Sequence, residues 1–129
     1  MRYLSLDEAM RIAEDVTGID ADTLARISRI ELLDSALHTP SSGFGDDEFY
    51  PDVFSKAAIL GIRIAMNHPL PDGNKRLAWA AVHIFHRIND FALSFTDDEA
   101  VDLMLRIASG NVDVDEFSEW LRARATPIK

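Results

Sequence analysis

Apolar residues recur every three or four positions along most of the chain, and this spacing predicts α-helices. Ser5 and Glu8 have the spacing of a capping box, and the apolar positions after them predict a first helix that ends at Gly18. Residues 22–37 have the pattern of one or two short helices, which Pro40 stops. The first third of the chain is therefore predicted to be helical.

The two central helices are predicted to be buried. Residues 53–67 and 77–89 are apolar on nearly all sides, and a helix with this pattern is covered by other helices. The segment before them, residues 39–51, is rich in proline, serine, glycine and acidic residues, which indicates a long loop. Residues 91–95 alternate briefly and are compatible with either a short strand or an extended link.

Two more helices complete the pattern. Thr96 and Glu99 form a second capping box, at the start of a helix that runs through Ala108. Residues 113–125 have the spacing of a last amphipathic helix. Together these patterns predict an all-α fold, a compact bundle of about six helices in a single domain over residues 1–129. A small hairpin within the loops is compatible with the sequence but is not established by it.

Composition narrows the class of protein. The 129 residues are 47% hydrophobic and 27% charged, as in soluble globular proteins. The absence of cysteine excludes disulfides and thiolate chemistry, and the N-terminal residues lack the apolar stretch of a signal peptide. A net charge of −9 argues against direct DNA binding, which depends on clustered Lys and Arg. We expect a cytoplasmic protein with no membrane contact.

The connection between the two buried helices concentrates the chemistry of the chain. It reads His68-Pro69-Leu70-Pro71-Asp72-Gly73-Asn74-Lys75-Arg76. The prolines keep its first half out of a helix, and the glycine allows a sharp turn before the next helix begins. Free N–H groups at a helix start favour an anion. A base, a carboxylate able to bind a metal and a phosphate site are therefore predicted side by side in this motif loop, residues 68–76.

The motif loop resembles the signature of the Fic/Doc family. The Fic branch carries H-P-F-x-D/E-G-N-G-R-x-x-R, and the Doc (death-on-curing) toxins carry H-x-F-x-D/N-A/G-N-K-R. This chain has Lys75 where Fic enzymes have glycine and Trp79 where they have a second arginine, so it is closer to the Doc branch. Leu70 replaces the usual phenylalanine and is expected to anchor the loop in the core.

The resemblance implies a reaction. Fic enzymes usually transfer a nucleotidyl group, whereas Doc is thought to pass the terminal phosphoryl group of ATP to elongation factor Tu and so to stop translation. We therefore expect a protein kinase of the Doc type that uses ATP and Mg²⁺. Two alternatives remain open at this stage: a protein AMP transferase, and a catalytically inactive binding module of the same fold.

The polar residues of the motif loop have expected roles. His68 is the candidate general base, because an imidazole titrates near neutral pH. Asp72 is the candidate Mg²⁺ ligand, and Lys75 and Arg76 are candidates for binding phosphate and stabilising its developing charge. The catalytic set is therefore His68, Asp72, Lys75 and Arg76. Gly73, Asn74, Lys75 and Arg76 are expected to bind the nucleotide phosphates at the helix start.

The resemblance also implies partners. No Ser or Thr is followed four positions later by Glu, so the inhibitory helix found in many Fic enzymes is absent, and inhibition by a separate antitoxin is expected. In the family a flap positions the target protein, and residues 41–50, with Phe44, are the expected flap here. His83 and His86 are three residues apart, and without a carboxylate or cysteine ligand nearby we expect them to be structural.

Overall fold

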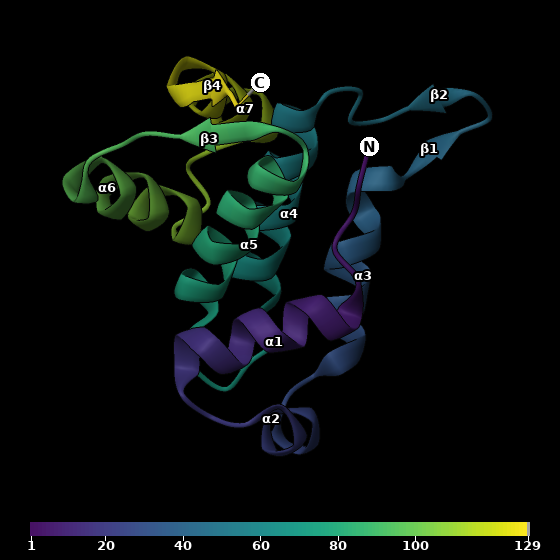
Figure 1. The fold of residues 1–129 in the computed structure, drawn as a ribbon, viewed down its shortest axis with the longest axis vertical. Coiled ribbons are helices and arrows are strands. Elements are labelled where there is room, and N and C mark those ends of the chain that lie inside the picture. The colour runs from purple at the N-terminus through teal and green to yellow at the C-terminus, as the bar shows by residue number, and fades with distance from the viewer. Residues whose placement is uncertain (129) are drawn as a thin grey trace.

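The structure, a computed structural model, describes residues 1–128. Within this range the chain forms seven α-helices, one 3₁₀-helix and two pairs of very short strands, which confirms the all-α fold (Figure 1). The helices are α1 (Leu6–Thr17), α2 (Ala21–Ile27), α3 (Ile30–His38), η1 (Thr39–Ser41), α4 (Val53–Asn67), α5 (Asn74–Ile88), α6 (Asp97–Ala108) and α7 (Val114–Arg124). The strands are β1 (Gly43–Phe44), β2 (Asp47–Glu48), β3 (Phe91–Leu93) and β4 (Ala125–Pro127).

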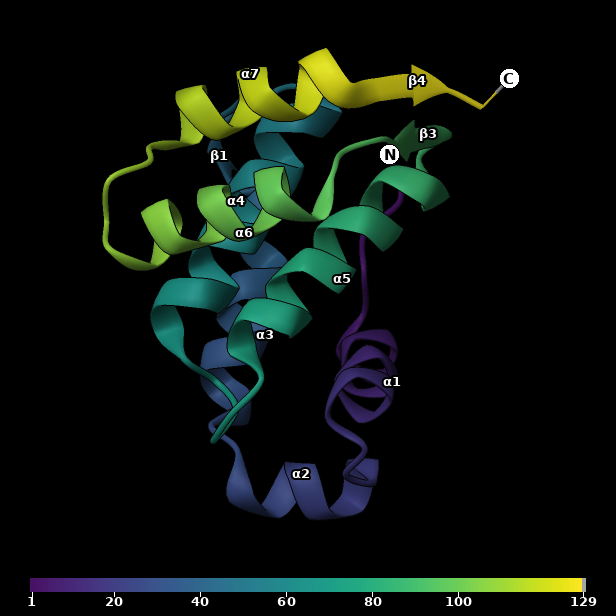
Figure 2. The same cartoon turned by 90° about the vertical axis from the view of Figure 1, so that its left-hand side faces the viewer.

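Helices α4 and α5 form the centre of the bundle, as their apolar pattern predicts. They pack side by side, with α3 and α7 against α4 and α1 against α5 (Figure 1). Ile64 on α4 and Leu77 and Phe85 on α5 are fully buried. Figure 2 shows α6 and α7 on one side of this central pair. No helix within residues 1–128 combines the length and the apolar content that crossing a lipid bilayer requires.

The helix ends follow the local sequence signals. The Ser5 hydroxyl accepts from the Glu8 N–H while the Glu8 carboxylate accepts from the Ser5 N–H, so the first capping box is present. Thr96 and Glu99 make the same reciprocal pair. Gly18 ends α1 in the left-handed region with φ 75°. These ends could be predicted because their contacts are local.

Two features of the fold go beyond the sequence pattern. Residues 22–37 divide into α2 and α3, with a break at Ser28 and Arg29. Strand β3 confirms the extended reading of residues 91–95, but its partner β4 was not expected and pairs with it in antiparallel register. Residues 1–128 therefore form seven α-helices rather than about six, and β4 lies beside β3 at one end of the bundle. Pairing between segments so far apart leaves no local signal.

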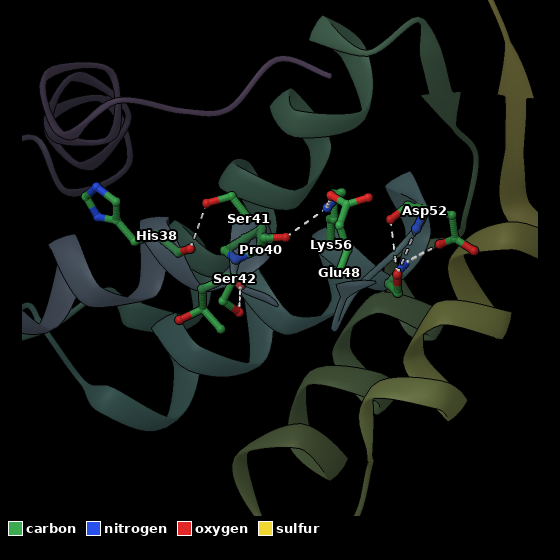
Figure 3. A network of polar contacts seen from close by, with 9 residues as sticks. His38, Pro40, Ser41, Ser42, Glu48, Asp52 and Lys56 are labelled. Carbon is green, nitrogen blue, oxygen red and sulfur yellow. Dashed lines mark hydrogen bonds and ion pairs between the residues drawn. The ribbon is translucent and has the colours of Figure 1, made fainter. Parts of the chain in front are cut away.

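The loop before α4 contains the small hairpin β1–β2, and a buried lysine attaches it to the bundle. Lys56 on α4 is only 1% exposed. Its ammonium donates to the Pro40 carbonyl at 2.9 Å and to the Glu48 carboxylate at 2.8 Å (Figure 3). Burial opposes the charge, but the contacts with Glu48 and Tyr3 outweigh it and raise the pKa of Lys56. The ammonium therefore stays charged and joins η1, β2 and α4.

His86 has a structural role, as predicted. Its ring is fully buried on α5, and Nδ1 lies 2.8 Å from the Val82 carbonyl, so Nδ1 carries the proton and donates. Nε2 is buried without a hydrogen-bond partner. Burial lowers the pKa of His86, and it also lowers that of His83. No group of three or more potential metal ligands occurs in the described part of the chain.

Lys56→Met is expected to lower the free energy of unfolding by about 1–3 kcal/mol, because the Pro40 carbonyl and the Glu48 carboxylate lose their charged donor. It should also make the β1–β2 hairpin a preferred site of limited proteolysis. Urea unfolding and protease mapping measure these two effects. Lys75→Met, at an exposed lysine, is the matched control and should change neither. Equal stability and equal cleavage in both variants would contradict the anchoring role of Lys56.

The buried His86 also predicts a dependence of stability on pH. Its pKa is lowered in the folded protein, so below the ordinary value of 6.5 the unfolded chain binds more protons than the folded chain. The free energy of unfolding should therefore decrease as the pH falls from 7 to 5. Urea titrations over this range should give a shallower slope of stability against pH for His86→Leu than for the wild type. Identical slopes in the two proteins would count against this account.

Candidate active site

The motif loop joins the C-terminal end of α4 to the N-terminal end of α5. His68 ends α4 in the left-handed region with φ 49°, which is uncommon for a residue with a side chain. Gly73 precedes α5 with φ 86°. A Cβ at Gly73 would also lie 3.0 Å from Cγ2 of Thr17. The loop therefore turns sharply at both ends, and glycine is required at the second turn.

Asn74 holds the loop closed. Its side-chain Oδ1 accepts from the Leu70 N–H, and its Nδ2 donates to the Leu70 carbonyl, both at 2.9 Å. Both residues are buried, and Leu70 is only 3% exposed. Leu70 therefore anchors the loop in the core, as predicted. The side chain of Asn74 is occupied by the loop itself, so only its backbone N–H is available for a phosphate.

A second support comes from Arg29, which the sequence reasoning missed. Arg29 lies in the break between α2 and α3, where its guanidinium donates to the His68 carbonyl at 2.7 Å. Its backbone N–H donates to the Pro69 carbonyl at 2.8 Å. These contacts fix the backbone of the candidate base from a segment 39 residues away in the chain. No motif in the sequence indicates a contact over this separation.

The predicted chemical groups surround one pocket of about 390 Å³. Its wall contains His68 and Asp72 from the loop and Lys75 and Arg76 from the first turn of α5. These four side chains belong to exposed residues and are open to a ligand. The structure therefore brings together all of the predicted catalytic residues.

The start of α5 is open to an anion. Asp72 Oδ1 accepts from the Gly73 N–H at 2.8 Å, and no side chain caps the helix. Among residues 1–128, the N–H groups of Asn74, Lys75 and Arg76 have no hydrogen-bond acceptor. Three unpaired donors and the positive end of the helix dipole point into the same region as two cationic side chains. A phosphate group fits this arrangement.

Arg76 is held in position by α1. Its Nη1 donates to the Val16 carbonyl at 2.9 Å, in the last turn of α1, where carbonyl groups carry a partial negative charge. The other end of its guanidinium lies beside Gly73. Arg76 therefore lies across the helix start, and the loop turn and α1 together determine its placement.

The hairpin does not reach this pocket. It precedes the N-terminus of α4, whereas His68 follows the C-terminus, so the two lie at opposite ends of the helix. Both ribbon views show the connection from α4 to α5 at the end of α4 away from the hairpin (Figures 1 and 2). A helix of 15 residues is about 22 Å long. The expected flap, residues 41–50 with Phe44, therefore lies at the end of α4 away from His68, and its role in positioning a target stays a prediction. The segment that lies against the loop is the break between α2 and α3, at Arg29.

Comparison with known proteins agrees with this geometry. The sequence model of the Fic/DOC family matches residues 3–86, which include the whole motif loop. The chain belongs to the Fic/DOC family. A curated relative, Toxin Doc of Mycolicibacterium smegmatis, is 42% identical over 92 residues, which cover 70% of this chain and 71% of the relative. The resemblance to the Doc branch of the family is therefore confirmed.

Asn74→Ala is expected to lower the free energy of unfolding by about 2–3 kcal/mol, because the buried N–H and carbonyl of Leu70 would both lose their partners. Urea unfolding measures this loss. Asn111→Ala removes an amide at an exposed position and serves as the control, with an expected change near zero. If Asn74→Ala were as stable as this control, the loop would not depend on the amide.

Proposed function

We propose that this protein is a Doc-type toxin that transfers the terminal phosphoryl group of ATP to a hydroxyl group of a target protein. Elongation factor Tu is the proposed target, and its modification would inhibit translation. The observation that carries the proposal is the single pocket in which His68, Asp72, Lys75, Arg76 and the open start of α5 meet. Family membership and the similarity to a Toxin Doc support it.

The residues around the pocket suit this reaction. The attacking hydroxyl oxygen forms a bond to the terminal phosphorus while the bond from that phosphorus to the bridging oxygen breaks. ADP leaves with the electron pair of the broken bond, and His68 takes the proton of the hydroxyl. Arg76, Lys75 and the N–H groups of α5 stabilise the negative charge on the phosphoryl oxygens.

A magnesium ion fits the carboxylate of Asp72. One oxygen of Asp72 accepts from the Gly73 N–H, and the other is free to bind a cation. Mg²⁺ is typically held by one or two carboxylates together with phosphates and water, so a single exposed carboxylate beside a phosphate site is sufficient. When bound, the ion would neutralise phosphate charge.

An antitoxin is proposed as the physiological inhibitor. The relative is named a toxin, and the 129 residues contain no Ser or Thr followed four positions later by Glu, the pattern of the inhibitory helix. A separate protein would then have to control the pocket. The proposed place of action is the cytoplasm, where ATP and elongation factor Tu occur together.

Transfer of AMP is the competing activity. The position of the label within ATP distinguishes it from transfer of the terminal phosphoryl group. We expect elongation factor Tu to become labelled when ATP carries the label on its terminal phosphate, and to remain unlabelled when the innermost phosphate carries it. Autoradiography after electrophoresis detects the product. Label from the innermost phosphate would establish AMP transfer instead, and no label from either position would favour an inactive binding module.

His68→Ala is expected to abolish transfer without loss of stability. The side chain of His68 is exposed, and no hydrogen bond in the described structure involves its ring, so its removal should change the free energy of unfolding by less than about 0.5 kcal/mol. Activity assays and urea unfolding measure the two quantities on one preparation. His38→Ala, at another exposed histidine, should keep full activity. A large loss of stability in His68→Ala would contradict its assignment as the general base.

A further inference from the structure

The β1–β2 hairpin exposes two phenylalanine side chains to solvent. Phe44 is 81% exposed and Phe49 is 61% exposed, although large apolar residues are usually buried. Phe44 pairs with Asp47 across the hairpin. The next residue, Glu48, contacts Lys56 of the bundle. Because successive side chains of a strand point to opposite faces, Phe44 and Asp47 lie on the face of the hairpin that is directed away from the bundle.

The hairpin that carries this face is held in a defined position. Lys56 joins it to η1 and α4 through a buried ammonium group, as Figure 3 shows. The strands also approach closely at Gly43, where a Cβ would collide with the carbonyl oxygen of Asp47. Exposed aromatic side chains on a segment that the core holds in place are typical of an interaction surface.

The exposed side chains of the hairpin are acidic as well as aromatic. Asp46 and Asp47 are both exposed, and within residues 1–128 their carboxylates make no ion pair or hydrogen bond. We call Phe44, Asp46, Asp47 and Phe49 together the hairpin face. Carboxylates attract a cation by charge, and the faces of aromatic rings attract it through their quadrupole. The hairpin face therefore favours a cationic partner.

A pocket of about 300 Å³ adjoins the hairpin face, and its wall is also acidic. Phe49 lines it, together with Asp52 at the start of α4 and with Asp115 and Glu119 of α7. Arg122 is the one cation among the described residues of the wall, and it pairs with Asp52 and Glu119. The carboxylate of Asp115 makes no ion pair within residues 1–128. The pocket thus has room for a further basic side chain.

We propose that the hairpin face and this acidic pocket bind a basic segment of a protein partner, one that carries Arg or Lys together with apolar residues. Its cations would meet the carboxylates and ring faces, and its apolar groups would pack on Phe44 and Phe49. Charge complementarity selects this occupant, because a chain with a net charge of −9 repels nucleic acids, acidic segments and a second copy of itself. The surface lies at the end of α4 away from the motif loop, so the inference does not rest on the proposed function.

Selection from a peptide library tests the proposed chemistry. Short random peptides displayed on phage are selected on the full chain and counter-selected on the double variant Phe44→Ser/Phe49→Ser. We expect the retained peptides to have a positive net charge and to contain aromatic or aliphatic residues. Retained peptides that are neutral or acidic, or a failure to retain any peptide, would overturn the proposal.

The role of the aromatic side chains is measured with one retained peptide by fluorescence anisotropy. Phe44→Ser should weaken binding about tenfold, as truncation of an aromatic anchor at an interface typically does. Ile27→Ser, at an exposed apolar residue of α2, is the matched control and should leave binding unchanged. Because both residues are exposed, both variants should keep the melting temperature of the wild type. Equal binding by Phe44→Ser and the wild type would contradict the assignment.

The role of charge is measured with two double variants that change the net charge by the same amount. Asp46→Asn/Asp47→Asn should weaken binding about threefold, whereas Asp7→Asn/Asp15→Asn, at exposed positions on α1, should have no effect. Equal weakening in both would indicate long-range attraction alone and would overturn the hairpin face as the binding site. A wild-type dimer in size-exclusion chromatography that Phe44→Ser converts to a monomer would assign the face to a second copy of the chain instead.

Discussion

The candidate site depends on one paired interaction, the two hydrogen bonds between the side chain of Asn74 and the backbone of Leu70. They close a loop that neither helix can continue, because His68 and Gly73 both adopt left-handed conformations at its ends. Leu70 then buries the closed loop against the core. Because the packed helices α4 and α5 hold both ends of this loop, its exposed side chains have well-defined positions.

The candidate site also depends on backbone N–H groups at the start of α5 that make no hydrogen bond within residues 1–128. Helices α1, α2, α4, α6 and α7 are each capped by a side chain, whereas α3 and α5 begin without one. The first N–H groups of α5 are left to an external acceptor at a point where two cationic side chains converge. An uncapped start at the edge of a buried helix costs stability unless a ligand or water supplies the acceptor. The arrangement is consistent with a site that is completed by phosphate.

The two ends of helix α4 carry different features of the molecule. One end carries the β1–β2 hairpin, which Lys56 holds against the bundle (Figure 3), and the other carries the motif loop supported by Arg29. The hairpin is too far away to cover His68, so a target bound over the pocket would meet the break between α2 and α3. A second pocket extends in another direction, along α5 toward α6.

The sequence by itself determined the helical elements, the capping boxes, the burial of α4 and α5 and the position of the motif loop between them. These features depend on contacts within a few residues, or on a motif whose chemistry is contiguous in the chain. It could not place the hairpin relative to His68, pair β3 with β4, or connect Arg29 with the loop. Those outcomes depend on how helices pack across 20 residues or more, where the energy comes from non-directional burial and leaves no periodic signal. The tertiary structure alone decided that Trp79, Lys75 and Arg76 share one continuous cavity with residues of α6.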